Sequence, residues 1–205
     1  MSNLKKSLRD CLLEASEEVY DLRDLQEIGE EAENLSLGSI DLKECSFSGC
    51  SFLDSRFQAT GFDRVVFRDC DLTGCSFSEC GLRQVTFLGC RMLGTNFSDC
   101  TLTGCRFEDC QGKYMGLVAC TLKQPVLSDC SMSGGSLSRS KLQRPSISRC
   151  DLTRCDFSGA ELGSVDLSTS AIDGATWTIS QLKNITVTTA QAIDLARLMG
   201  LNIVP

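Results

Sequence analysis

The sequence predicts an all-β solenoid in which the chain winds into about eight four-sided coils, with a helical segment before them and a short capping helix after them. Two repeats predict it. A large apolar residue occupies every fifth position from Leu37 to Val187, with Gly112 as the one exception. Like residues also recur every twenty positions, as these cysteines do: Cys50, Cys70, Cys90, Cys110, Cys130 and Cys150.

A repeat of five matches neither regular helices nor regular strands. A helix repeats its buried face every 3.6 residues and a strand every 2. A coil that closes after twenty residues has four sides of five residues and places like residues on top of one another. One coil cannot bury its apolar residues alone, whereas stacked coils bury a continuous column. Two positions before each large residue lies a compact one, such as Cys45, Ser55 or Val65.

These repeats resemble the pentapeptide-repeat family, whose loose pattern is a small apolar residue, a polar one, Leu or Phe, and two polar ones. The stretches Cys70–Gly74 (CDLTG) and Ala160–Ser164 (AELGS) match it closely. The resemblance covers residues 35–189, about three quarters of the chain. It implies a right-handed, quadrilateral parallel β-helix with the large and the small residue both pointing inward.

The N-terminal segment, residues 1–34, is expected to be helical over 3–33, with a second helix starting at Asp21. Its apolar residues recur at spacings of three and four: Leu4, Leu8, Cys11, Leu12, Ala15 and Val19. Such a stripe predicts an amphipathic helix. Two interpretations remain open: a cap over the end of the solenoid, or a helix that binds a partner or another copy.

The net charge of −7 is concentrated at the N-terminus. Residues 1–34 hold ten acidic and four basic residues, a net −6, whereas residues 35–189 are almost neutral at −1. Acidic residues line two predicted corners of the solenoid: Asp69, Asp109 and Asp129 on one, Glu79 and Asp99 on another. A belt of arginines (Arg139, Arg144, Arg149, Arg154) precedes an acidic belt (Asp151, Asp156, Glu161, Asp166), and we expect ion pairs between them.

Residues 111–118 are the weakest part of the repeat. Gly112 would leave a hole in its column, and Met92 and Met132 lie above and below it. Because methionine fills irregular gaps, we expect a local bulge here. A functional loop is the alternative.

The C-terminal segment, residues 190–205, predicts a helix that starts after Thr188 or Thr189, runs to about Met199 and stops at Gly200. Trp177 is expected in the coil beneath it. The segment has more apolar residues than a cap alone needs. We therefore expect it to cap the solenoid and also to pair with a second copy, through these residues: Ile193, Leu195, Leu198, Met199, Leu201 and Ile203.

The cysteines predict packing rather than disulfides or metal sites. Of the 14 cysteines, all but Cys11 lie in the compact position of the repeat, where a free thiol acts as a small apolar group. We expect reduced thiols and a cytoplasmic protein, with no signal peptide and no membrane segment. The chain has no histidine and no nucleotide-binding or nucleophile motif. We therefore expect no catalytic residues, no cofactor and no metal, and hence no enzyme.

The C-terminal stretch QAIDLARLMGLNIVP (191–205), following such a solenoid, resembles the quinolone-resistance (Qnr-type) branch of the family. That resemblance implies a dimeric rod of DNA-like shape that binds DNA gyrase or topoisomerase IV and protects it from inhibitors, without binding nucleic acid itself. The acidic corners would make the contacts by mimicking phosphates. The alternative is a structural or scaffolding protein with another partner.

Overall fold

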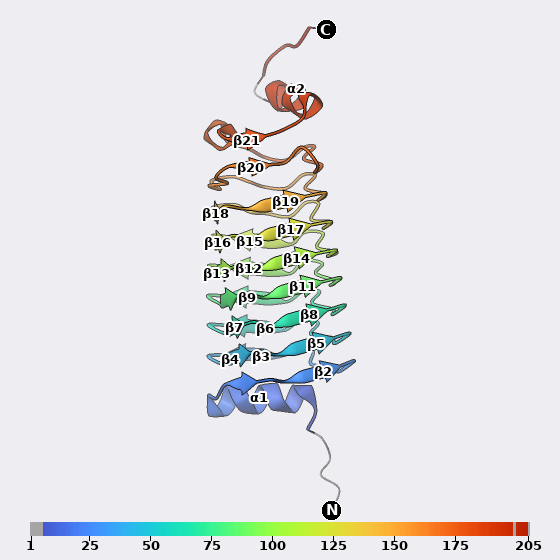
Figure 1. Ribbon diagram of the computed structural model, residues 1–205, viewed down its shortest axis with the longest axis vertical. Coiled ribbons are helices and arrows are strands. Elements are labelled where there is room, and N and C mark those ends of the chain that lie inside the picture. Colours follow the sequence, from blue (N-terminus) through green and yellow to red (C-terminus); the bar gives the residue numbers. More distant parts are fainter. Residues whose placement is uncertain (1–5, 199, 205) are drawn as a thin grey trace, which may run out of the picture.

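The structure is a computed structural model that describes residues 6–198 and 200–204. It is a rod of stacked coils, about eight turns long, with a helix across each end (Figure 1). The N-terminal helix is α1 (Leu8–Glu18) and the C-terminal helix is α2 (Thr189–Leu198), which follows the short 3-10 helix η1 (Ile179–Leu182). The predicted solenoid, with a helix at each end, is confirmed.

Parallel strands form three of the four sides. The first side is a seven-stranded sheet of β1 (Leu22–Arg23), β4 (Asp41–Lys43), β7 (Gly61–Asp63), β10 (Gly81–Arg83), β13 (Thr101–Thr103), β16 (Thr121–Lys123) and β18 (Lys141–Gln143). The second is a seven-stranded sheet of β2 (Gln26–Ile28), β5 (Ser46–Ser48), β8 (Val66–Arg68), β11 (Thr86–Leu88), β14 (Arg106–Glu108), β17 (Val126–Ser128) and β19 (Ser146–Ser148).

The third side is a five-stranded sheet of β3 (Ser36–Gly38), β6 (Arg56–Gln58), β9 (Ser76–Ser78), β12 (Asn96–Ser98) and β15 (Gly116–Val118). The fourth side consists of single bridges from Glu31↔Ser51 to Asp151↔Ala171. Near the C-terminal end, β20 (Val165–Asp166) pairs with β21 (Ile185–Thr186).

Each coil is twenty residues long. Phe47 pairs with Phe67 and Phe67 with Phe87 in parallel register. The thiol column is stacked in the same way, since Asp71 N donates to Cys50 O and Arg91 N to Cys70 O, both at 2.9 Å. The prediction that residues twenty apart lie on top of one another is confirmed.

The interior consists of the large residues and the compact ones between them. Phenylalanine rings stack along the axis, for example Phe67 on Phe87 with centroids 5.1 Å apart and 4° between planes. The compact position favours Cys, Ser and Thr because most of these side chains donate to a carbonyl of the preceding coil. Cys75 Sγ lies 3.0 Å from Phe52 O and Thr95 Oγ1 lies 2.7 Å from Leu72 O. Buried polar groups are thereby satisfied.

The prediction that the N-terminal segment is helical over residues 3–33 is wrong for the second half of the segment. Helix α1 ends at Glu18, and the next residue, Val19, adopts a left-handed conformation (φ 54°) that stops the helix. The coils begin at Leu22, which pairs with Leu42, and not at residue 35. The five-residue apolar repeat is not visible in the sequence of these first coils, because two inward positions lack a large apolar residue. Glu27, which is only 3% exposed, and the small Ala32 occupy them. Within the described residues, the expected second helix from Asp21 does not form; residues 3–5 lie outside them.

Helix α1 caps the first coils with an apolar face. Leu8, Leu12 and Ala15 are fully buried, and the side chain of Ser7 accepts a hydrogen bond from Asp10 N at 3.1 Å. That Ser-x-x-Asp sequence is the signal by which the start of the helix could have been found. The cap interpretation of the segment therefore agrees with the structure.

The expected bulge at 111–118 is absent. The ladder continues through it, with Gln111 N donating to Cys90 O at 2.9 Å and Gly112 N to Ser131 O at 2.7 Å. Met115, in the compact position, fills the space that Gly112 leaves. A Cβ on Gly112 would lie 3.3 Å from both Cβ and Sδ of Met115. No loop projects here either, so the functional-loop alternative also fails.

The C-terminal end closes as predicted. Thr188 caps α2, because its Oγ1 accepts a hydrogen bond from Gln191 N at 3.2 Å, and Gly200 follows with a φ of 81°. Trp177 stacks on Phe157 with centroids 4.2 Å apart. None of the described helices is long and apolar enough to cross a membrane.

Candidate binding surfaces

The corners of the coils carry the exposed side chains that a partner would meet. At each corner from Asp24 to Gly159 one residue adopts a left-handed conformation, for example Asp69 (φ 52°) and Asp129 (φ 56°). The turn is held because the corner N–H donates to the next coil, as Asp69 N does to Leu88 O at 2.8 Å. A side chain at this position points outward on a rigid backbone.

The structure places the predicted acidic residues on two corners. Asp69, Asp109 and Asp129 share one column, and Glu79 and Asp99 share another; all five are exposed. Gly89 separates Asp69 from Asp109, and the Asp69 side chain leans over it: a Cβ on Gly89 would lie 2.4 Å from Asp69 Oδ1. Side chains at these corners therefore lean toward the following coil.

Asp129 differs from the other four carboxylates. Arg149, one coil further along the same column, donates to both of its oxygens at 2.6 Å. These hydrogen bonds lower the pKa of Asp129 below its usual value. Within the described residues the other four form no ion pair. The first acidic corner thus ends in a neutralised carboxylate.

The expected pairing of the two charged belts is wrong. Several ion pairs on this solenoid join equivalent positions of successive coils, such as Arg64–Glu44, Arg91–Asp71 and Lys141–Glu161. Belt arginines and belt carboxylates occupy different positions of the repeat, so they do not face each other. Asp151, Asp156 and Asp166 instead accept backbone N–H groups two residues later, at 2.9–3.0 Å.

Three arginines of the belt therefore remain without a carboxylate in the part of the chain that the structure describes: Arg139, Arg144 and Arg154.

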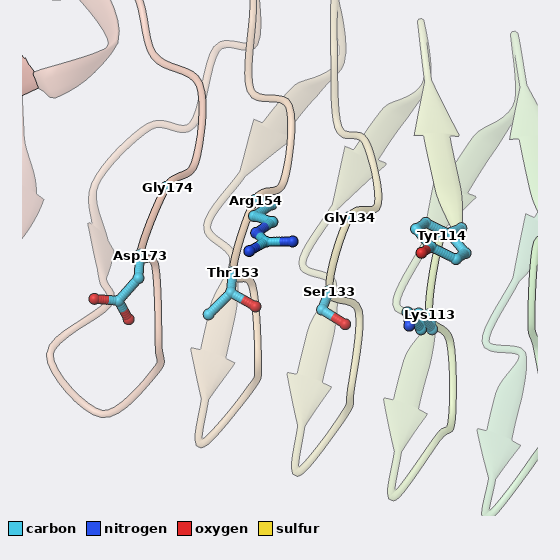
Figure 2. A pocket seen from close by; sticks show the side chains of 8 residues that line it. All are labelled: Lys113, Tyr114, Ser133, Gly134, Thr153, Arg154, Asp173 and Gly174. Carbon is cyan, nitrogen blue, oxygen red and sulfur yellow. The ribbon is translucent and has the colours of Figure 1, made fainter.

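Arg154 borders a groove of about 540 Å³. Figure 2 shows its lining: Lys113 and Tyr114 lie on one coil, and Ser133, Thr153 and Asp173 follow in a row on the next three. The sequence patterns did not indicate this groove, because they do not show how neighbouring corner side chains lean.

The C-terminal end carries a group of exposed apolar residues. Leu198 is 63% exposed, and Leu201 and Ile203 are also exposed. Leu195 is a correction to the expected interface, since it is only 9% exposed and packs against the solenoid. Ile193 is half-buried, and Met199 lies outside the described residues. A neighbouring apolar groove of about 490 Å³ includes Trp177, Ile179 and Leu182.

The thiols lie inside the solenoid and are not arranged as a metal site. All 14 are free, and all but Cys11 are buried. Among residues 6–198 and 200–204, no group of three His, Cys, Asp or Glu side chains is placed to hold a metal ion.

Comparison with known proteins identifies the repeat. A family model described as "Pentapeptide repeat region" matches residues 40–116 and 84–152. A second family model, described as "Pentapeptide repeats (8 copies)", matches residues 136–170. No curated protein sequence matches the chain.

Several solved structures match the chain over most of its length. A trypsin-treated variant of QnrB1, a plasmid-mediated fluoroquinolone resistance protein, is 20% identical, with 90% of this chain and 99% of that chain covered and a TM-score of 0.41. Rfr23 from the cyanobacterium Cyanothece 51142 is 10% identical, with coverage of 87% and 98% and a TM-score of 0.41. HetL, involved in heterocyst differentiation regulation in the cyanobacterium Nostoc, is 15% identical, with coverage of 88% and 94% and a TM-score of 0.37. From the sequence matches and the coil geometry together, this chain belongs to the pentapeptide-repeat family.

Proposed function

We propose that this protein is a non-enzymatic, protein-binding rod that mimics DNA, binds DNA gyrase or topoisomerase IV and protects the enzyme from inhibitors. The observation that supports this most is the set of exposed carboxylates on two corners of a rigid rod. Asp109 and Asp129 stand on neighbouring coils of one corner, and Glu79 and Asp99 on neighbouring coils of another. Carboxylates on a rigid backbone can engage a basic, DNA-binding surface at little conformational cost.

A second candidate is a scaffold that binds another protein without mimicking DNA. Arg149 neutralises Asp129, and the belt arginines interrupt the acidic corners. DNA mimicry calls for a sustained negative field, so these arginines favour the scaffold.

A supercoiling assay with gyrase and a quinolone distinguishes the two. Protection at micromolar protein concentration supports mimicry; a lack of both binding and protection at that concentration eliminates it and leaves the scaffold. A variant with Asp109→Asn and Asp99→Asn should need at least about tenfold more protein to protect, because charge-assisted contacts are lost. Asp54→Asn is the matched control, since Asp54 has the same left-handed corner conformation (φ 53°) on a column outside the acidic corners.

We further propose that the C-terminal end forms a homodimer through Leu198, Leu201 and Ile203. Leu198→Asp should convert the dimer into a monomer on a sizing column, since it places a charge in an apolar contact. Ile28→Asp is the control, because Ile28 is 81% exposed at the opposite end. An unchanged elution volume for Leu198→Asp would exclude this interface.

Finally, we propose that the protein works in the reducing cytoplasm, where its 14 thiols remain free. Thiol titration in denaturant, on protein purified without reductant, should find close to all of them. A count near zero would contradict the assignment.

A further inference from the structure

The groove beside Tyr114 and Arg154 is built by alternation along one corner. Tyr114, Gly134, Arg154 and Gly174 follow one another at intervals of one coil, so side chains are present on every second coil. Both glycines adopt left-handed φ values of 68° and 66°. The Tyr114 ring leans over Gly134, where a Cβ would lie 2.7 Å from Tyr114 Cε1. The glycines make room for these leaning side chains, since a Cβ on Gly174 would likewise lie 3.4 Å from Arg154 Cγ. The groove is the recess that runs along this corner beside them.

Hydrogen-bond donors without acceptors surround this recess. Lys113 Nζ lies 5.0 Å from the centre of the Tyr114 ring, and neither Lys113 nor Arg154 has a carboxylate partner among the described residues. The hydroxyl groups of Tyr114 and Ser133 form no hydrogen bond with the described part of the chain. Thr153 differs, because its hydroxyl donates to Asp151 at 2.7 Å. Four donor groups therefore face one groove without an acceptor.

The spacing of the two cations suits an anion between them. Neighbouring coils are roughly 4.8 Å apart, so Lys113 and Arg154 start roughly 10 Å apart, with Ser133 between them. A phosphate monoester has three strong acceptor oxygens and pairs well with guanidinium and ammonium donors.

Asp173 places a negative charge at the far end of the groove. It lies one coil beyond Arg154 at the end of the groove (Figure 2), and it is the one carboxylate in the lining. A carboxylate repels a bare phosphate but accepts hydrogen bonds from hydroxyl groups. A ligand that carries its phosphate at one end and hydroxyl groups at the other satisfies both ends of the groove.

We propose that this groove binds a small organic phosphate with hydroxyl groups, such as a sugar phosphate, with the phosphate between Lys113 and Arg154 and a hydroxyl group on Asp173.

The test is an NMR titration of the full chain with two probes, ribose 5-phosphate and inorganic phosphate. Ribose 5-phosphate should give saturable shifts at the amides of Ser133, Gly134, Thr153 and Arg154, and it should bind more tightly than inorganic phosphate. Arg154→Gln and Lys113→Gln should each weaken binding roughly three- to tenfold, as expected for charged contacts at an exposed site. Asp173→Asn should reduce the preference for the sugar phosphate.

Arg139→Gln is the matched control. Arg139 has the same left-handed conformation (φ 58°) on the same belt, and a glycine follows it one coil later, Gly159, but it is not part of the lining of this groove. Its substitution should leave binding unchanged. No saturable shift, equal effects of Arg139→Gln and Arg154→Gln, or an unchanged preference in Asp173→Asn would each overturn the proposal. The amide spectrum of every variant shows directly whether it is folded.

Discussion

At the scale of single residues, Gly112 and Met115 exchange the roles that their positions have elsewhere. The position of Gly112 normally holds a large apolar residue and that of Met115 a compact one. Met115 is 1% exposed and occupies the space beside Gly112. Met115 thereby fills space that a large residue at position 112 would otherwise take, as a close-packed interior requires.

This exchange predicts a compensating pair of substitutions. Met115→Ala should lower the free energy of unfolding by about 2–4 kcal/mol, because it leaves a cavity. Gly112→Leu alone should lower it by about 1–3 kcal/mol through overpacking. The double variant restores the usual order of large and compact residues and should be more stable than either single one. Urea unfolding measures this, and additive losses would contradict the exchange.

At the scale of elements, two glutamines attach the C-terminal cap to the coils. Gln191 Oε1 accepts from Thr188 N at 2.8 Å, while its Nε2 donates to Ser170 O at 2.7 Å and Leu167 O at 3.2 Å. Gln181 repeats the arrangement ten residues earlier, with Thr178 N at 2.7 Å and the carbonyls of Phe157 and Ala160. Each glutamine side chain thus accepts a backbone N–H at the start of a helix and donates to two carbonyl groups at the end of the solenoid.

Replacing either glutamine should detach the cap. Gln181→Ala leaves one N–H and two carbonyls of a buried site without their partner and should cost about 1–3 kcal/mol. Gln191→Ala should additionally increase hydrogen exchange at Thr188 and along α2. The exposed Gln143 is the control, since Gln143→Ala should change stability by less than about 0.5 kcal/mol. Equal effects at all three positions would refute the attachment.

At the scale of the whole molecule, the buried thiols make the free energy of unfolding fall as the pH becomes alkaline. Burial raises the pKa of Cys75 and Cys155 to about 12 and that of Cys105 to about 11. An unfolded chain ionises these thiols from about pH 9. Above that pH the unfolded state binds fewer protons than the folded one, so raising the pH favours unfolding. The stabilisation is complete below pH 9 and is lost progressively up to the pKa values of the folded state.

The expected result is a fall in unfolding free energy of about 1.4 kcal/mol per pH unit for each such thiol above pH 9. A variant with Cys75→Ser, Cys105→Ser and Cys155→Ser should show a shallower decline between pH 9 and 10.5, whatever its stability at pH 7. Urea midpoints across that range measure the slope. Identical slopes in the two proteins would show that these thiols are not responsible.

The coils, the inward-facing residues and the columns could be derived from the sequence because a solenoid is almost one-dimensional. Contacts join residues twenty positions apart, so the repeat that folds the chain is visible in the order of its residues. Columns such as Asp109 over Asp129 follow from that arithmetic. The start of the solenoid did not follow, because Glu27 and Ala32 break the apolar pattern without breaking the backbone ladder.

Only the tertiary structure decided which surface groups meet. Corner side chains lean toward the following coil, as Asp69 does over Gly89 and Tyr114 over Gly134. That lean depends on whether the next corner holds a side chain or a glycine, and on rotamers that periodicity does not specify. For this reason Arg149 pairs with Asp129 along a column and not with the acidic belt, and the groove beside Arg154 opens. The sequence alone determined most of the interior of the rod, because packing repeats, whereas the outer surface depends on particular neighbours in space.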